Sequence, residues 1–455
     1  MELTRNKFIR WSLILFSVMI ALVAGIATVK SPAHVLAGIL LITAGWLALF
    51  RYPFSILLLV IGIVPLTALD GLNESGSISV TKVFFAPLLI IICLQKIFNS
   101  ENFKWSFQAT CIVLYFCILV LSAVFSEYRA ICWHVSLKHY IGIILLFFAT
   151  LQLIDSRRKF KAILWTIMLS CTVSATNSLL GGGIVVGRAT GLSIIDPNSW
   201  AGNILVGMFI AAGMAIHTRG MWKKLPFFVM ATVCLMGIVF SDSRGAALAV
   251  MAGAVAMAFL YRKNIKPAHV LFAVATLIVV VTLFIPESYW ERIQSLRDMQ
   301  TDPSLIRRFS YQIIGLKLFI THPIVGVGPG ISTFQYASQE FRYITDYIVT
   351  GPRFLHNMYL QILADSGLLG FFAFMLCTAS TFYSFIRSSR TYERTNDNDG
   401  LFMARTIIIT FSGFMFSNLF LPAIYYKYTW LHFAMASFLL SDSKEINDGM
   451  PFTTT

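Results

Sequence analysis

Three short stretches of this 455-residue chain combine residue types that suit phosphate chemistry. The first contains Arg188, the second is Ser243-Arg244-Gly245, and the third contains His356. A guanidinium group can bind two phosphate oxygens side by side, and a histidine can take up a proton near neutral pH. Two arginines and a histidine that met in one site would suit transfer of a group from a diphosphate to a hydroxyl.

Arg188 lies in a glycine-rich stretch, residues 181–191, which is followed by Asp196-Pro197-Asn198. Glycines permit positive φ angles and close backbone approach, so this stretch could bring a cation up to an anion. The alternative interpretation is a flexible loop whose arginine reaches out to lipid phosphates.

Arg244 would stand in the first turn of a helix, where the positive end of the helix dipole opposes a cation. Asp242 or Ser243 could cap this helix. A bound anion would make the position favourable for Arg244, whereas a local ion pair between Asp242 and Arg244 is the alternative.

His356 would stand at the N-terminus of a membrane helix, where the dipole disfavours the protonated imidazole and leaves a general base. A purely structural histidine is the alternative, and His322 is predicted to shape a turn. Further candidates for contact with a substrate, each with a solvated surface position as its alternative, are Arg353, Asn357, Arg307 and Arg308.

The composition predicts the elements that must position these residues. Of the chain, 57% is hydrophobic and only 12% is charged, which makes a soluble enzyme improbable. Apolar runs such as 11–29 and 268–285 are long enough to cross a bilayer and do not alternate as barrel strands do. The net charge of +14 is scattered between these runs and forms no basic stripe for nucleic acid. We therefore predict an all-α polytopic membrane protein.

Hydropathy predicts about 12–14 transmembrane helices. They are expected near 11–29, 33–50, 53–69, 83–98, 108–125, 138–154, 160–180, 199–216, 225–241, 245–261, 268–285, 358–386, 402–421 and 425–440. Two of these pairs, 33–50 with 53–69 and 402–421 with 425–440, have short connections and could be re-entrant.

The Lys and Arg residues predict the orientation. With Arg5, Lys7 and Arg10 in the cytoplasm, most of the 35 Lys and Arg residues lie on the cytoplasmic side. Arg188, Arg244 and His356 then share the outer face. We predict a transmembrane domain over 1–285, a large helical outer loop over 286–356, with helices near 304–320 and 331–345, and further membrane helices with a short cytoplasmic tail over 357–455.

Metal and redox chemistry are not indicated by the sequence. The seven cysteines form no C-x-x-C pair, so neither a disulfide framework nor a zinc site is predicted. Asp397 and Asp399 form the acidic cluster on the inner side, and we expect them in an ordinary solvated loop. No metal site and no cofactor are expected.

Several of these stretches resemble the O-antigen ligase and O-antigen polymerase family. The resemblance is carried by Ser243-Arg244-Gly245, by the stretch from Thr321 to Gly330, and by His356-Asn357-Met358-Tyr359 with the stretch from Asp365 to Gly370. The outer loop with Arg188 and Asp196-Pro197-Asn198 is also similar to that family. Together these stretches cover residues 181–375, less than half of the chain.

The resemblance implies a GT-C-like, metal-independent, inverting glycosyltransferase in the bacterial inner membrane, with its site facing the periplasm. Its donor would be a glycan linked to undecaprenyl diphosphate, and its acceptor lipid A-core oligosaccharide. Arg188 and Arg244 would bind the donor diphosphate, and His356 would activate the acceptor hydroxyl. The charge that grows on the leaving diphosphate would be stabilised by these preorganised cations.

Other functions remain open at this point. A polymerase of O-antigen or exopolysaccharide would use the same chemistry with a lipid-linked repeat unit as acceptor. An oligosaccharyltransferase that modifies proteins is disfavoured, because the chain ends soon after its last predicted helix. A transporter of lipid-linked glycan is also disfavoured, because the candidate charges lie at the outer boundary rather than at the membrane midplane and no repeated halves are seen.

Overall fold

The computed structural model describes residues 52–66, 80–185, 187–191, 196–262, 303–332, 354–421 and 423–448. The helices predicted near 11–29, 33–50 and 268–285 lie outside these residues, as do Arg353 and most of the helix predicted near 331–345.

The described chain is almost entirely helical, and the predicted all-α polytopic membrane protein is confirmed. Among the described residues, seven helical stretches are long and apolar enough to cross a membrane. These are α5 (Phe107–Phe125), the stretch Arg129–Leu153, α8 (Arg157–Leu179), α9 (Pro197–His217), α10 (Met221–Phe240), α17 (Met358–Arg394) and α18 (Asn398–Ser417). The stretch Arg129–Leu153 contains α6 (Arg129–Ile131), the π-helical turn η1 (Cys132–Leu137) and α7 (Lys138–Leu153).

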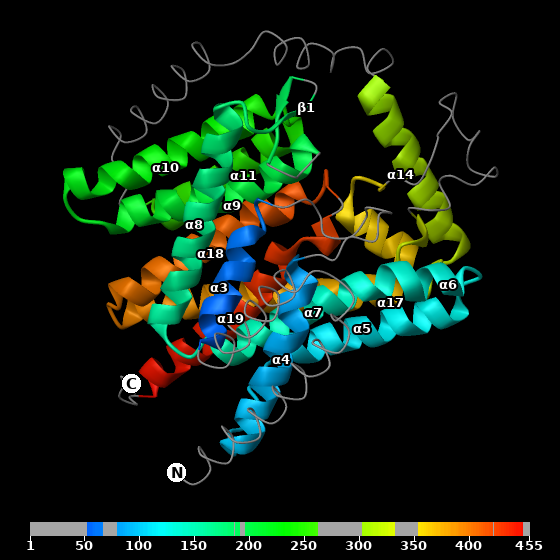
Figure 1. Ribbon diagram of the computed structural model, residues 1–455, viewed down its shortest axis with the longest axis horizontal. Helices are drawn as coiled ribbons and strands as arrows, with labels where there is room; N and C mark the ends of the chain where they lie inside the picture. The colour runs from blue at the N-terminus through cyan, green and yellow to red at the C-terminus, as the bar shows by residue number, and fades with distance from the viewer. Residues whose placement is uncertain are drawn as a thin grey trace, which may run out of the picture.

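The remaining described elements are shorter or less apolar. They are the helices α3 (Pro53–Ile63), α4 (Val80–Phe98), α11 (Arg244–Leu260), α14 (Pro303–Thr321) and α19 (Lys427–Asn447), the 3-10 turn η3 (Ala423–Tyr425), and a two-residue hairpin of β1 (Ile184–Val185) and β2 (Arg188–Ala189). Figure 1 shows these elements along the chain. Polar caps mark where several helices begin: Ser106 caps α5 and Ser156 caps α8 through their side chains.

Helix α9 lies at the centre of one half of the bundle and is buried over nearly its whole length. Small residues allow this dense packing, as is usual between membrane helices. A Cβ atom on Gly207 would overlap Cys171 of α8, and one on Gly213 would overlap Thr406 of α18. The helix can therefore hold its first turn in a defined place between its neighbours.

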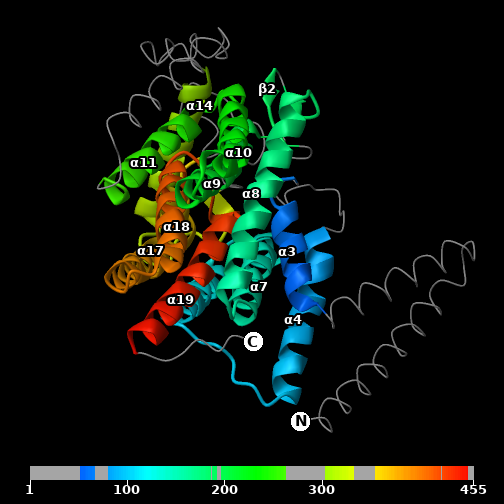
Figure 2. The ribbon, with the colours of Figure 1, turned by 90° about the vertical axis from the view of Figure 1, so that its left-hand side faces the viewer.

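The helices alternate in direction, so their ends form two layers. Helices α9, α11, α17 and α19 begin in the layer where α8, α10 and α18 end, which we call the His356 end. Figure 2 shows β2 and α14 toward this end, with the last turns of α4 and α19 toward the opposite end. The elements thus place all three predicted stretches in one layer.

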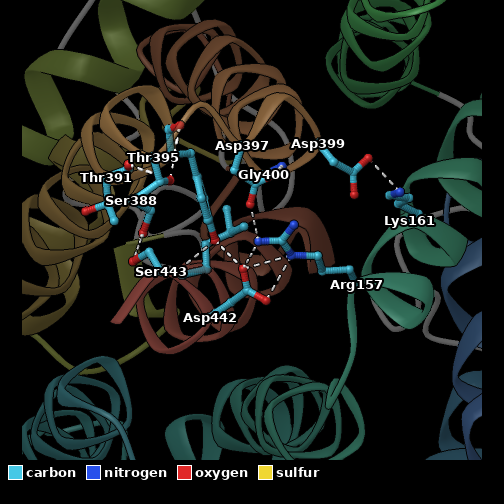
Figure 3. Close-up of polar contacts among 12 residues, drawn as sticks. Arg157, Lys161, Ser388, Thr391, Thr395, Asp397, Asp399, Gly400, Asp442 and Ser443 are labelled. Carbon is cyan, nitrogen blue, oxygen red and sulfur yellow. Dashed lines mark hydrogen bonds and ion pairs between the residues drawn. The ribbon is translucent and has the colours of Figure 1, made fainter. Parts of the chain in front are cut away.

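The opposite end is held together by buried and half-buried charges (Figure 3). Arg157, at the start of α8, contacts Asp442 of α19 at 2.8 Å and Asp397 at 2.5 Å. Lys161 contacts Asp399 at 2.7 Å. The prediction of an ordinary solvated loop at Asp397 and Asp399 is therefore wrong. Hydropathy did not show it, because their partners lie about 240 residues away in sequence.

Candidate functional site

Arg188 is fixed at the His356 end by protein oxygens. Its Nε donates to the carbonyl oxygen of Ser241 at 2.8 Å, and one terminal nitrogen donates to the Asn198 side chain at 3.3 Å and to the Asp242 carbonyl at 3.4 Å. The antiparallel hairpin presents it there, with Arg188 opposite Val185. The guanidinium therefore joins the hairpin, the end of α10 and the start of α9.

Asp196 begins α9 and organises its first turn. Its carboxylate accepts hydrogen bonds from the backbone N–H groups of Asn198 and Ser199, from the Asn198 carboxamide at 3.1 Å, and from the Ser199 hydroxyl. Since Asn198 also accepts from Arg188, Asp196 and Arg188 are joined through one side chain. The stretch Asp196-Pro197-Asn198 is thus both a helix cap and a link to the arginine.

Asp196 interacts electrostatically with two other groups at this end. Burial alone would raise the pKa of Asp196. The hydrogen bond from the Ser199 hydroxyl and the charge interaction with His356 outweigh this effect, so the pKa lies below its ordinary value. Burial also raises the pKa of the Tyr426 phenol, and the charge of Asp196 adds to that rise. Asp196 therefore stays a carboxylate, with His356 within electrostatic reach and Tyr426 neutral.

His356 lies two residues before the start of α17. Its φ of 52° is in the left-handed region that non-glycine residues rarely adopt. The ring stacks on Tyr311 of α14, with centroids 5.8 Å apart and planes 19° from parallel. The Met358 N–H, just after it, donates to the Asn418 carbonyl at 2.9 Å. These contacts hold the imidazole between α14, α17 and the end of α18.

Asn357 caps α17, because its side-chain oxygen accepts from the backbone N–H groups of Tyr359 at 3.0 Å and Leu360 at 3.1 Å. The cap satisfies donors that a helix start leaves without partners. Because the cap uses the side-chain oxygen of Asn357, the predicted contact of this residue with a substrate would be made by its amide nitrogen.

Arg244 is the first residue of α11, as the sequence predicted, and Ser243 is the cap that accepts from the Ala246 N–H. The next residue, Gly245, packs so closely on Phe420 that an added Cβ would approach its side chain to 2.8 Å. Phe420 follows α18, and Asn418 in the same turn contacts the start of α17. The end of α18 thus lies between the helix starts that carry Arg244 and His356.

Two of the stretches on which the family resemblance rests interlock below this layer. Helix α17 is broken at Gly367, with φ 62° and ψ −164°. The N–H groups of Leu368 and Leu369 donate instead to the carbonyls of Pro323 and Ile324. The carbonyls of Ala364 and Asp365 in turn accept from the N–H groups of Val327 and Gly328. The loop after α14 therefore replaces the missing turn of the helix.

Glycine is required at both sides of this junction. A Cβ on Gly367 would overlap the Ile324 carbonyl, and one on Gly326 would overlap the Asp365 backbone. Both residues also have positive φ angles. Every backbone group inside a membrane needs a hydrogen-bond partner, so the glycines let the loop supply the partners that the break removes. The loop after α14 is thereby fastened to the helix that begins beside His356.

The other predicted residues are only partly placed. Arg308 is half-buried on α14, three residues before Tyr311 and so on the same side of that helix. The backbone of Arg307 is described as part of α14, but its side chain is not, and Arg353 lies outside the described residues. Their roles in substrate contact stay predictions.

The sequence indicated Arg188, Arg244 and His356 as candidates, and the structure places them at the same end. Sequence patterns assign no separate role to Asp196, Tyr311 or Tyr426. In the sequence, Asp196 stands out only as part of the motif Asp196-Pro197-Asn198. Its capping position, directly before a proline at the first turn of a helix, was the available signal. Tyr311 and Tyr426 had no signal, because aromatic residues in apolar surroundings usually pack without further function.

The arrangement of these groups suits anion binding and proton transfer. The N-termini of α11 and α17 lie on either side of the end of α18, and helix N-termini favour negative charge. Arg188 and Arg244 add cations to this layer, while His356, with Asp196 in electrostatic reach, can accept a proton. This combination suits the departure of a phosphate-containing group while a hydroxyl is deprotonated.

The comparison with protein families agrees with this chemistry. Residues 227–375 match the family model described as O-antigen ligase. The match includes Arg244, the interlocked junction and His356, whereas Arg188 and Asp196 precede it. No curated protein matches the chain.

Proposed function

We infer that this chain, whose residues 227–375 match the family model described as O-antigen ligase, is a glycosyltransferase that transfers a glycan from undecaprenyl diphosphate to lipid A-core oligosaccharide. The reaction would take place at the periplasmic face of the bacterial inner membrane, without a metal, and with inversion at the anomeric carbon. The membrane-embedded bundle would receive both lipid-linked substrates at the His356 end.

One observation supports this proposal above the others. Arg188, the start of α11 with Arg244, and the start of α17 with His356 meet around the end of α18, although they are far apart in sequence. Arg188 contacts the turn that leads to Arg244. The end of α18 contacts the helix starts of both Arg244 and His356.

The diphosphate would bind between the arginines and the starts of α11 and α17. An anion in this place would relieve the conflict between the Arg244 guanidinium and the dipole of its own helix. Because the Arg188 side chain is held by the carbonyls of Ser241 and Asp242, its cation would need little reorganisation as charge grows on the leaving group.

His356 would act as general base. The acceptor hydroxyl attacks the anomeric carbon of the donor sugar, its proton passes to His356, and the bond from that carbon to the diphosphate oxygen breaks. Undecaprenyl diphosphate leaves with the bonding electron pair. The imidazolium formed on His356 would be stabilised by the Asp196 carboxylate, whose low pKa keeps it charged. Tyr311, stacked on the ring, would keep the imidazole in one orientation.

The test is a transfer assay with purified protein, undecaprenyl-diphosphate-linked glycan and two acceptors supplied separately. We expect glycan to appear on lipid A-core oligosaccharide, and EDTA to leave the rate unchanged. A ladder of longer lipid-linked chains formed from the second acceptor, a lipid-linked repeat unit, would identify a polymerase instead. Release of free glycan or transport without transfer to either acceptor would contradict the proposed function.

A further inference from the structure

A buried carboxylate lies beside the break in α17. Asp365 is 1% exposed, and its Oδ1 accepts the Ser332 N–H at 3.1 Å. Its Oδ2 is buried and has no hydrogen-bond partner among the described residues, and Asp365 takes part in no ion pair among them. A buried carboxylate that lacks such compensation is costly, so the second oxygen calls for an explanation.

Two further buried side chains next to this carboxylate also have polar atoms without hydrogen-bond partners among the described residues. Gln361 precedes Asp365 by one helical turn and is fully buried, and both polar atoms of its carboxamide are without partners in the described part of the chain. The Ser332 hydroxyl is also fully buried and unpartnered there. The Gln361 side chain, the Ser332 side chain and the Gly330 N–H all interact with the Asp365 carboxylate. Among the described residues, one carboxylate oxygen, one carboxamide and one hydroxyl therefore lie close together without hydrogen bonds of good geometry.

The chemistry of these oxygens selects the kind of ligand. A carboxylate, a carboxamide oxygen and a hydroxyl are hard donors of the type that bind alkali and alkaline-earth cations. Divalent cations are usually held by several carboxylates, whereas this cluster carries one negative charge. The first half of α17 ends here as well, and the C-terminal end of a helix favours positive charge. A single monovalent cation would balance the carboxylate.

We propose that Asp365, Gln361 and Ser332 bind one monovalent cation, sodium, at the break in α17. The cation neutralises the buried carboxylate. It also ties Ser332, in the loop after α14, to the helix that carries His356 at its start. Its role is structural, and the proposal does not depend on the transferase chemistry.

The test is thermal unfolding of the purified full-length protein in detergent, at constant ionic strength, in sodium, potassium, lithium or N-methylglucamine chloride. We expect sodium to raise Tm in a saturable way above N-methylglucamine. Asp365→Asn should remove this dependence. Ser332→Ala keeps the backbone N–H bond to Asp365 and should raise the half-saturating sodium concentration about tenfold, as loss of one ligand oxygen predicts.

The matched control is Ser122→Ala. The Ser122 hydroxyl donates to the backbone carbonyl of Asp365 at 2.9 Å, so its loss weakens the same junction without removing a proposed ligand. This variant should unfold at a lower temperature but keep the sodium dependence. Equal Tm values of the wild type in all four salts would overturn the proposal. So would a Tm that rises only as the pH is lowered, since the carboxyl would then be neutralised by a proton.

Discussion

Asp242 and His356 adopt the same left-handed backbone conformation at equivalent places in the fold. Their φ angles are 51° and 52°, and each residue directly precedes the cap of a helix at the His356 end. Ser243 then caps α11, and Asn357 caps α17. Positive φ angles in non-glycine residues cluster at active sites and ligand-binding sites, where the surrounding structure maintains them. The pair thus marks the two helix starts between which we place the diphosphate.

The backbone at Asp242 gives a first prediction. Asn tolerates the left-handed region, whereas a β-branched residue does not. Both Asp242→Asn and Asp242→Val remove the carboxylate, so their difference reports the backbone conformation. We expect Asp242→Val to be less stable than Asp242→Asn by about 1–2 kcal/mol, measured by thermal unfolding. Equal stabilities would contradict the conformation described for this turn.

Arg188 gives a second prediction. Lysine keeps the positive charge but cannot make the forked contacts with the carbonyls of Ser241 and Asp242. Arg188→Lys should raise the KM for the lipid-linked donor by about tenfold or more. The control is Arg219→Lys, an exposed arginine between α9 and α10 at the opposite end, which should leave the KM unchanged. If the donor KM were the same in both variants, Arg188 would not be part of the donor-binding site.

The interlocked junction gives a third prediction. In Gly367→Ala the new Cβ would overlap the Ile324 carbonyl and would require a positive φ of 62°. We expect a loss of several kcal/mol in unfolding free energy, or failure to fold. Gly142→Ala on α7 is the control, because nothing lies within 4 Å of its added Cβ. That variant should be at least as stable as the wild type, because alanine is the better helix former. If Gly367→Ala were equally stable, the junction would not be arranged as described.

The charges at the opposite end give a fourth prediction. Burial raises the pKa of Asp397, but the hydrogen bond from Arg157 lowers it more, so the folded protein holds it below the ordinary value of 3.8. The group therefore adds stability above pH of about 4, and this contribution disappears as the pH falls through the lowered pKa. Asp397→Asn should lower Tm at pH 7 but approach the wild type in acid. A constant difference over this range would exclude the ionic contribution.

Hydropathy predicted several helices closely. The predicted segment 199–216 became α9, 225–241 became α10, and 245–261 became α11, with ends within four residues. The predicted outer helix near 304–320 became α14. Apolar length and turn residues act locally, so a single sequence reports them directly.

Other features depended on contacts between distant segments. Nothing in the apolar run 358–386 shows that α17 breaks at Gly367, because the break is stabilised by the loop around Gly326. The sequence marks Asp196 as part of the Asp196-Pro197-Asn198 motif, but only the fold places it within electrostatic reach of His356. Single-sequence patterns identify residue types, whereas the partners that give them a role are supplied by tertiary packing.

The most direct test of the account is glycan transfer by His356→Asn. Asparagine accepts the left-handed backbone at this position but offers no base, so the chemistry is removed with little strain. We expect kcat to fall by about 100-fold or more while the KM for the lipid-linked donor changes little. His322→Asn, an exposed histidine after α14, is the matched control and should retain wild-type kcat. If His356→Asn turned over at the rate of that control, His356 would not be the general base.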